Sequence, residues 1–505
     1  MGAIARPPCE EAAIRARPCE APATTNRRFI LVTAILGSSM AFIDGTVVNV
    51  ALPVLQSDLR ATIYGVQWVV ESYTLFLAAL LLIGGSLGDV YGRRAIFAAG
   101  VLLFTLASAW CGLSLNIEQL IIAWSLQGVG GALLVPGSLP LISVNFPENQ
   151  RGRAIGTWSG ATAITTAIGP VLGGWLVEQG SWRWAFFINI PVGVAVLALA
   201  AWRVPESRAG VPRQRAAVPG AVLAVLGFGG VVFGLIQSSW TSAAVGAIGV
   251  VALLWWERRA PSPMIPLHLF RSRNFTGANV LTLFLYSALS GVLFFLPLNL
   301  IHVQGYSPAG AGAALLPLSV LLFALSRWSG GLVDRYGPRR PLVIGCLITI
   351  VGFGLFAIPG IGGSYWTTIF PAVLVLGLGL AISVAPLTTT VMNSVDQSHA
   401  GTASGINNAV SRTAGLLAIA VLGVLMNSLF QSSLDRRLEN LAVGNAERAQ
   451  VDAQRSRLAA TETDDPRARA AINKAFVDGY RGVVWVATAL AAASALSAAL
   501  LIRRT

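Results

Sequence analysis

Apolar residues occur in long runs along most of the chain, separated by short polar or charged stretches. An α-helix needs about 20 predominantly apolar residues to cross a bilayer, and fourteen runs are of roughly that length. They predict an all-α integral membrane protein with fourteen transmembrane helices. The expected ranges are 29–52, 66–87, 95–113, 119–143, 154–178, 182–202, 218–237, 241–256, 274–301, 306–328, 341–360, 367–392, 402–428 and 481–502.

Arginines are distributed unevenly between the loops that join these runs. If the N-terminus lies in the cytoplasm, the loops and termini on that side hold most of them, and short loops on the other side hold only Arg60 and Arg183. Because positive residues in short loops mark the cytoplasmic side, we expect both termini to be cytoplasmic. Residues 1–28 are basic and lack an apolar core with a cleavage site, so we expect a cytoplasmic tail there rather than a signal peptide.

A charged turn occurs twice, at 85–94 and at 330–340, and divides the chain. Each copy follows the second span of a six-span set if 218–237 and 241–256 are treated as an insertion. This predicts two six-helix bundles, 29–202 and 274–505, connected by an inserted helix pair within 203–273. Paired bundles of this kind enclose a midplane cavity and rock about it. The second bundle includes a long outer loop, 429–480, which we expect to be a partly helical hairpin or a mobile cap.

Composition narrows the class of protein further. The net charge of +13 would suggest a nucleic-acid partner in a soluble chain, but 55% of the residues are hydrophobic and only 11% are charged. We therefore interpret the arginines as topology signals and expect no nucleic-acid binding. The four cysteines and three histidines show no ligand spacing, so we expect no metal site and no disulfide. Abundant Ala and Gly, with arginine in place of lysine, suggest a GC-rich bacterial source and hence a plasma membrane.

Both copies of the charged turn combine glycines, an aspartate and paired arginines. Asp89 and Asp334 come where the next helix begins, so we expect them to cap its free N–H groups and to meet its positive dipole end. The arginines would stay in the headgroup layer. An ordinary positively charged loop is the alternative. The residues of this expected conformational switch are Gly85, Asp89, Gly92, Arg93, Arg94, Asp334, Arg339 and Arg340.

The first copy, Gly-Ser-Leu-Gly-Asp-Val-Tyr-Gly-Arg-Arg at 85–94, resembles the signature of the major facilitator superfamily. The runs 42–53 and 181–191 resemble its fourteen-span drug:proton antiporter branch, and together the resemblance covers most of residues 29–428. It implies the superfamily's fold and transport by alternating access. The run Gly169-Pro170-Val-Leu-Gly173-Gly174 resembles the motif associated with antiporters. Its proline removes a helix hydrogen bond and its glycines allow close helix contact, although small-residue packing alone would explain a lone GxxxG.

Two acidic residues lie within the first two spans. Asp44 is about eight residues from the outer end, which is roughly 12 Å deep at 1.5 Å per residue. A charged group there should face a wet cavity, unless it is a structural aspartate bonded to backbone. Glu71 lies at similar depth in a polar stripe with Gln67 and Thr74. If the two acids meet, burial and like charge would let them exchange a proton in each cycle; alternatively, Glu71 only lines the outer vestibule.

The fourth span departs from the family's pattern. That pattern places an arginine three residues before a Gln-Gly pair, and this chain has Trp124 there, before Gln127. The departure leaves Arg412, in the run 407–412, as the best cation near mid-membrane. We expect Asp44, Glu71 and Arg412 to couple proton and substrate movement. Further cavity candidates are Asn49, Gln67, Trp124 and Gln127.

These patterns predict a proton-coupled exporter of amphipathic, cationic drugs or toxic compounds. We expect it to work as a monomer, with the proton gradient as its energy source and no cofactor. An ATP-driven pump does not fit, because the sole lysine, Lys474, follows Asn473 rather than the glycine of a Walker loop. A membrane enzyme is a weaker alternative, because no HExxH or nucleophile motif occurs. A transporter of a specific metabolite or lipid on the same fold remains open.

Overall fold

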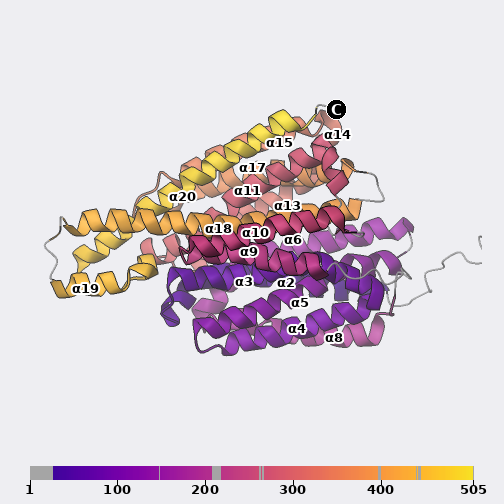
Figure 1. Ribbon diagram of the computed structural model, residues 1–505, viewed down its shortest axis with the longest axis horizontal. Helices are drawn as coiled ribbons and strands as arrows, with labels where there is room; N and C mark the ends of the chain where they lie inside the picture. Colours follow the sequence, from indigo (N-terminus) through magenta and orange to yellow (C-terminus); the bar gives the residue numbers. More distant parts are fainter. Residues whose placement is uncertain are drawn as a thin grey trace, which may run out of the picture.

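The computed structural model describes residues 27–146, 148–207, 218–260, 263, 267–395, 400–439, 441 and 445–503. Within these ranges every regular element is a helix and no strand occurs, which confirms the all-α prediction. The helices lie side by side along the longest axis of the molecule (Figure 1). The polypeptide therefore satisfies its backbone hydrogen bonds within each segment, as a bilayer requires.

The first bundle is built from long helices with short connections. Polar caps start two of them: the Thr62 hydroxyl accepts a hydrogen bond from the Gly65 N–H at 3.2 Å, and the Asn116 carbonyl oxygen accepts one from the Gln119 N–H at 2.9 Å. The helices are α2 (Arg27–Asp58), α3 (Ile63–Tyr91), α4 (Arg93–Leu113), α5 (Ile117–Asn145), α6 (Glu148–Gln179), α7 (Trp184–Phe187) and α8 (Asn189–Arg203).

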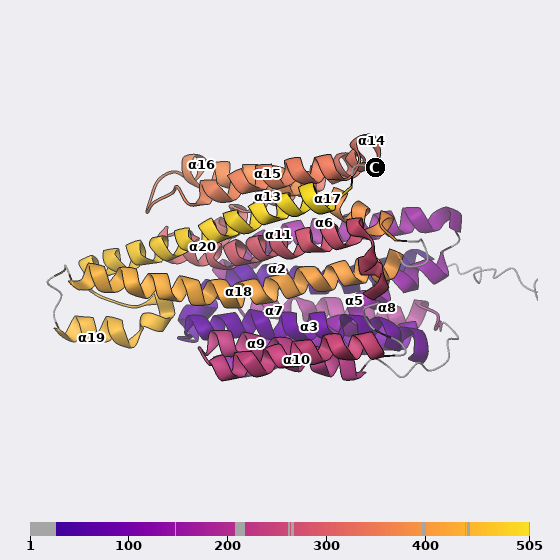
Figure 2. The same ribbon diagram turned by 45° about the horizontal axis from the view of Figure 1, so that its top comes forward.

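An inserted pair and a second bundle follow. The pair, α9 (Val218–Ile236) and α10 (Trp240–Arg259), lies beside α3 (Figure 2). A short helix, η1 (Leu267–Arg271), leads to the second bundle. Its elements are α11 (Arg273–Leu298), η2 (Asn299–Val303), α12 (Pro308–Ala313), α13 (Leu316–Gly330), α14 (Leu332–Tyr336), α15 (Arg339–Phe356), α16 (Tyr365–Thr368), α17 (Phe370–Asn393), α18 (Ala400–Glu439) and α20 (Pro466–Leu501).

Thirteen helical segments of the described chain are long and apolar enough to cross a membrane. They correspond to thirteen of the fourteen expected spans. The remaining run, 154–178, lies in α6, where the side chains of several residues fall outside the described part of the chain. This helix still packs along α2 and α12. Four expected spans are each divided between consecutive helices: 182–202 between α7 and α8, 274–301 between α11 and η2, 306–328 between α12 and α13, and 367–392 between α16 and α17.

The described residues between 429 and 480 form a structure that we call the cap. The 40 residues of α18 make a helix about 60 Å long, twice the apolar thickness of a bilayer, so α18 projects beyond the bundles together with the start of α20. Between them lie α19 (Asn445–Ala453) and η4 (Arg455–Ala460). The described part of the cap is thus helical, as expected. We call this the cap end of the molecule and the other the basic end.

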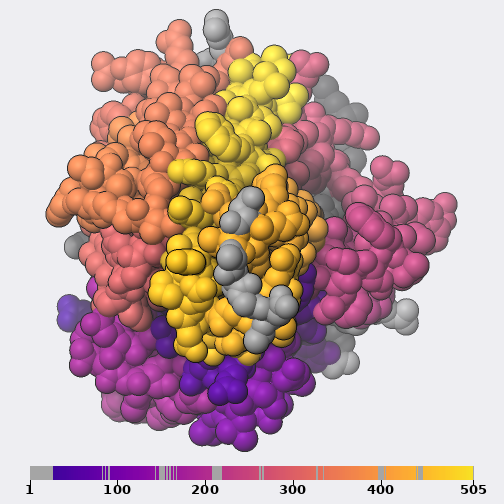
Figure 3. Space-filling view, turned by 90° about the vertical axis from the view of Figure 1, so that its left-hand side faces the viewer, coloured from indigo at the N-terminus to yellow at the C-terminus, as the bar shows by residue number. Residues whose placement is uncertain are grey.

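The cap reaches from the second bundle over the first (Figure 3). Arg455 holds it together through ion pairs with Asp435 at 2.5 Å and Asp452 at 2.7 Å. The Gln56 side chain, near the end of α2, donates a hydrogen bond to the Arg457 carbonyl at 3.1 Å. The two bundles are therefore tied together at the cap end in this conformation.

Candidate functional site

Asp44 is fully buried in the first bundle and accepts hydrogen bonds from three neutral side chains. The Trp124 indole N–H donates to Oδ2 at 2.9 Å, and the Gln127 and Asn189 amides each donate to Oδ1 at 2.9 Å. The Ser108 hydroxyl accepts from the same two amides, at 3.3 and 3.0 Å. A carboxylate thus lies in a dry interior with its charge stabilised only by dipoles. The alternative of a backbone-bonded structural aspartate does not describe these contacts.

Four helices bring these groups together. Trp124 and Gln127 are three residues apart on α5 and so face the same way, while Asn189 is the first residue of α8 and Ser108 lies on α4. Sequence reasoning identified Trp124 and Gln127 but missed Asn189 and Ser108. The sequence signal that could have identified Asn189 was its position as a single amide side chain within the apolar run 184–197.

Trp124 occupies the place where the family's pattern has an arginine. Its ring stacks on Tyr73 with centroids 5.1 Å apart and meets the edge of Phe186 at 5.9 Å. The indole N–H supplies one hydrogen bond without supplying a charge. No arginine or lysine forms an ion pair with Asp44 in the described part of the chain, so the Asp44 site carries no compensating cation.

Glu71 is also fully buried, but both of its carboxyl oxygens lack a hydrogen-bond partner among the described residues. One turn earlier on α3, the Gln67 side chain donates to the Ile419 carbonyl of α18 at 3.0 Å. This face of α3 therefore points toward the second bundle, whereas Asp44 points into the first. No hydrogen bond joins the two acids, and the expected acid pair is not formed as a contact in this conformation.

Arg412 on α18 lies within electrostatic range of Tyr73. Its Nε is buried and has no hydrogen-bond partner within the described ranges. Tyr73 lies within electrostatic range of both Arg412 and Asp44, and its buried hydroxyl is likewise without a described partner. Tyr73 was not among the predicted site residues. It connects the stacked Trp124 ring to the second bundle, so the coupling of Arg412 to Asp44 remains a prediction that would act through this tyrosine.

The remaining polar candidate, Asn49, is hydrogen-bonded within its own helix. Its side chain is half-buried and donates to the Gly45 carbonyl of its own helix at 3.0 Å. This bond satisfies the amide locally, as short polar side chains often do in helices. Of the four expected cavity residues, two bind Asp44 and Gln67 bridges the bundles.

At the first charged turn, residues that follow α8 cap the second helix, which the sequence did not suggest. Gly92, with φ +120°, separates α3 from α4. The free N–H groups of Arg94 and Ala95 donate to the Glu206 carboxylate at 3.0 and 3.1 Å, and the Arg93 N–H donates to the Ser207 carbonyl at 2.9 Å. The segment after α8 therefore contributes to the cap of α4, because a carboxylate from another helix end reaches the positive end of the α4 dipole.

The aspartates of both charged turns, Asp89 and Asp334, have side chains outside the described residues, so their expected caps are not observed. In the second copy, Gly337 has φ +72°, and α15 begins at Arg339 directly after it. Arg340 is exposed. Gly85 lies within α3. The switching role of these residues therefore stays a prediction.

The glycine and proline hexapeptide lies on α6, where two interfaces meet. A methyl group on Gly169 would come 1.9 Å from the Thr46 hydroxyl, and one on Gly173 would come 2.6 Å from the Val47 carbonyl, both on α2. On the other side, a methyl group on Gly174 would lie 2.3 Å from the Pro308 carbonyl of α12. The glycines thus let α6 pack closely against its own bundle and against the second bundle.

A matching contact comes from the second bundle, where a methyl group on Gly312 would lie 2.1 Å from the Pro170 carbonyl. The Glu178 carboxylate also accepts a hydrogen bond from the Ala309 N–H at 3.3 Å. These contacts, like the Gln56 bond to the cap, join the bundles at the cap end. The conformation is therefore closed on that side.

Asp58, at the end of α2, forms a further polar cluster that the sequence did not reveal. It accepts hydrogen bonds from the Trp182 indole at 2.7 Å and from Arg183 at 3.0 Å. Arg183 in turn donates to the Ser114 carbonyl at 3.3 Å. This cluster joins the cap-end termini of α2 and α4 and explains why a lone arginine lies in this loop.

Comparison with known protein families and with individual proteins finds relatives of this chain. The family model for the Major Facilitator Superfamily matches residues 34–419. The multidrug resistance protein Stp of Mycobacterium tuberculosis (strain CDC 1551 / Oshkosh) is 35% identical over 81% of this chain and 78% of its own. The tetracenomycin C resistance and export protein of Streptomyces glaucescens is 35% identical over 79% and 76%, and a probable actinorhodin transporter of Streptomyces coelicolor is 33% identical over 87% and 78%.

Solved structures show the same fold at low sequence identity. A bacterial homologue of the human lysosomal transporter Spinster, described as inward-facing and unoccupied, superposes with a TM-score of 0.66 at 18% identity, covering 95% of this chain and 98% of that one. A D-xylose–proton symporter superposes with a TM-score of 0.61 at 15% identity, covering 95% and 99%.

Proposed function

The chain belongs to the major facilitator superfamily, and we propose that it is an antiporter that exports amphipathic, cationic drugs or toxic compounds in exchange for protons. It works in a bacterial plasma membrane as a monomer with both termini in the cytoplasm, so that the cap faces outward. The proton gradient supplies the energy and no cofactor takes part. Relatives named for multidrug or antibiotic resistance and export support this substrate class.

The observation that carries the proposal is the Asp44 site. Burial opposes the charged carboxylate, while three neutral donors at 2.9 Å stabilise it. These opposing effects leave both protonation states accessible. Because no cation is built into the site, either a proton or a bound cationic substrate can neutralise the carboxylate, but not both at low cost. Competition for one carboxylate produces exchange rather than co-transport.

The contacts at the cap end suggest how binding of the proton and binding of the substrate are separated. In this conformation the α6–α12 interface and the cap close that side, and Asp44 is sealed from it. Opening the cap end would require these contacts to separate, which would give Asp44 access to the external proton supply. The bundles would then rock back to present the site to the cytoplasm.

The test is transport by purified protein in liposomes. A cationic dye such as ethidium is loaded, a pH gradient is imposed, and dye movement is followed by fluorescence. Asp44→Asn, which is nearly isosteric but cannot titrate, should abolish gradient-driven movement while the protein still inserts. Asp464→Asn, the same change at an exposed residue of the cap, should transport like the wild type. Robust gradient-driven movement by Asp44→Asn would remove Asp44 from this role.

A further inference from the structure

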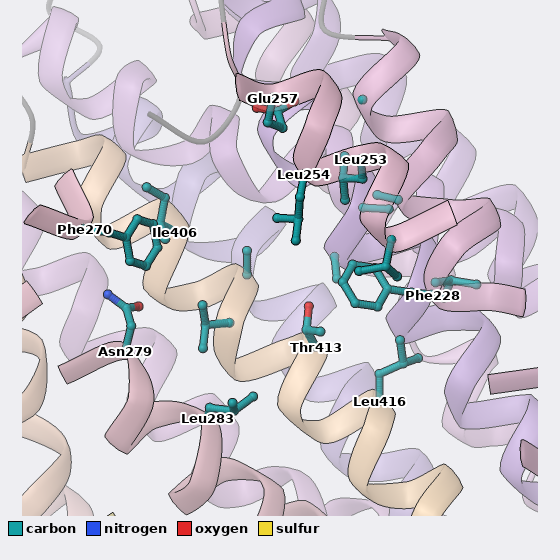
Figure 4. A pocket seen from close by; sticks show the side chains of 18 of the residues that line it. Phe228, Leu253, Leu254, Glu257, Phe270, Asn279, Leu283, Ile406, Thr413 and Leu416 are labelled. Atoms are coloured by element: carbon teal, nitrogen blue, oxygen red, sulfur yellow. The ribbon is translucent and has the colours of Figure 1, made fainter. Parts of the chain in front are cut away.

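A pocket of about 380 Å³ lies between the inserted helix pair and the place where the two bundles meet. Its volume is in the range of about 300–1,000 Å³ that is typical of small-molecule sites. Leu75, Phe228, Leu254, Phe270, Leu283 and Ile406 are among its walls, so α3, α9, α10, η1, α11 and α18 all contribute. None of the residues that bind Asp44 lines it. Figure 4 shows Glu257 at one end of the pocket and Leu416 at the other.

The pocket occupies the space that separates α10 from the second bundle. Of the inserted pair, α9 packs against α3 and α18, whereas α10 packs mainly against α9. On α10, Leu253, Leu254 and Glu257 line the pocket. An occupant would add dispersion contacts to these side chains.

Two polar residues that line the pocket, Thr276 and Asn279, are paired with the protein, and a third, Thr413, adds a hydroxyl. The Thr276 hydroxyl donates to the Phe270 carbonyl at 2.7 Å. The Asn279 amide donates to the Phe275 carbonyl at 2.9 Å, and its oxygen accepts from Asn407 at 3.1 Å. The interior of the pocket is therefore mainly apolar, which suits a hydrocarbon chain better than a polar ligand.

The end of the pocket at Glu257 carries charged residues. Glu257 is only 3% exposed and lies in the last turn of α10, where the helix dipole disfavours a negative charge. Arg258 and Arg259 follow it on the same helix, and Arg271 and Arg273 flank the junction of η1 and α11. One buried carboxylate among arginines complements a group that carries both an ammonium and a phosphate.

We propose that this pocket binds a phospholipid with a primary-amine headgroup, of the phosphatidylethanolamine type, from the leaflet at the basic end. One acyl chain fills the apolar pocket, the ammonium pairs with Glu257, and the phosphate pairs with the neighbouring arginines. The lipid joins α10 to the second bundle. This site goes beyond the proposed transport function, because its occupant is a resident lipid and not the exported compound.

Native mass spectrometry of the full-length protein tests the proposal. The protein is purified in mild detergent, mixed with defined amounts of phosphatidylethanolamine, phosphatidylglycerol or phosphatidylcholine, and the bound lipid is measured. The wild type should retain phosphatidylethanolamine in preference to the other two. Glu257→Gln should weaken phosphatidylethanolamine binding about tenfold and remove its preference over phosphatidylcholine.

Two further variants test the pocket itself. Ala224→Phe places a ring in the cavity and should prevent lipid retention, and Leu254→Trp does so from α10 if the first variant fails to fold. Ala247→Phe, on the exposed face of α10, should bind lipid like the wild type. Equal retention of the three lipids by the wild type, or unchanged retention by a filled variant, would overturn the proposal. Displacement of the lipid by ethidium would instead identify a cation site and would also overturn it.

Discussion

Trp124→Phe isolates one of the hydrogen bonds that stabilise the Asp44 charge. Phenylalanine keeps an aromatic ring between Tyr73 and Phe186, where the indole now stacks at 5.1 Å and meets an edge at 5.9 Å. It lacks the N–H that donates to Asp44 Oδ2 at 2.9 Å. The substitution therefore leaves that oxygen unpaired in a fully buried site, while the Gln127 and Asn189 bonds to Oδ1 remain.

The size of the expected pH shift follows from the charge of the hydrogen-bond acceptor, the Asp44 carboxylate. A hydrogen bond to a charged group contributes about 1.5–3 kcal/mol, and about 1.4 kcal/mol corresponds to one pH unit. The lost donor stabilised only the deprotonated form, so the variant should release its proton only at higher pH. We expect the pH at half-maximal efflux to rise by about 1 to 2 units.

The assay is the initial rate of ethidium movement in proteoliposomes over a series of pH values. Trp182→Phe is the matched control, because Trp182 is also buried in the first bundle and donates an indole hydrogen bond to an aspartate, Asp58. It should lose similar packing without moving the pH midpoint. An unchanged midpoint in Trp124→Phe, or an equal shift in both variants, would refute the reasoning.

Three further outcomes are expected. Glu71→Gln removes a buried carboxyl that has no described partner and should reduce transport of a dicationic dye more than that of ethidium; an equal effect on both dyes would argue against a role in charge tolerance. Gly312→Ala should slow turnover without loss of insertion, because its methyl group meets the Pro170 carbonyl, whereas Gly354→Ala, with nothing within 4 Å, should turn over normally. Glu206→Ala should destabilise the protein by about 1 kcal/mol in thermal unfolding, because α4 loses its cap; an unchanged unfolding temperature would contradict that assignment.

Local patterns in the sequence were sufficient to predict the helices and to identify some individual residues. Apolar runs predicted the spans because a bilayer demands about 20 consecutive apolar residues whatever the partners are. The acid in the first span was recognisable because a carboxyl in such a run is costly unless it has a role. The glycines of α6 were recognisable as contact points for the same local reason, although which helices they touch was not.

The hydrogen-bond partners of these residues were not predictable from the sequence, because hydrogen bonds between helices depend on how each helix is rotated and which neighbour it meets. Asp44 and Glu71 lie at similar depth, yet one faces α5 and α8 and the other faces α18. Glu206 reaches the free N–H groups of α4 from the end of α8, a cap that no local pattern near α4 indicated.

The sequence by itself determined that this is a many-spanning helical membrane protein with an internal repeat and a buried acid in its first helix. These features depend on hydropathy, periodicity and the cost of burying charge, all of which act locally. Only the tertiary structure decided that neutral donors from α5 and α8 surround Asp44, that the cap ties the two bundles together, and that an apolar pocket of about 380 Å³ lies beside α10. Each of these arises where segments distant in the chain pack against one another, and the helix rotations that create such contacts are set by the whole assembly.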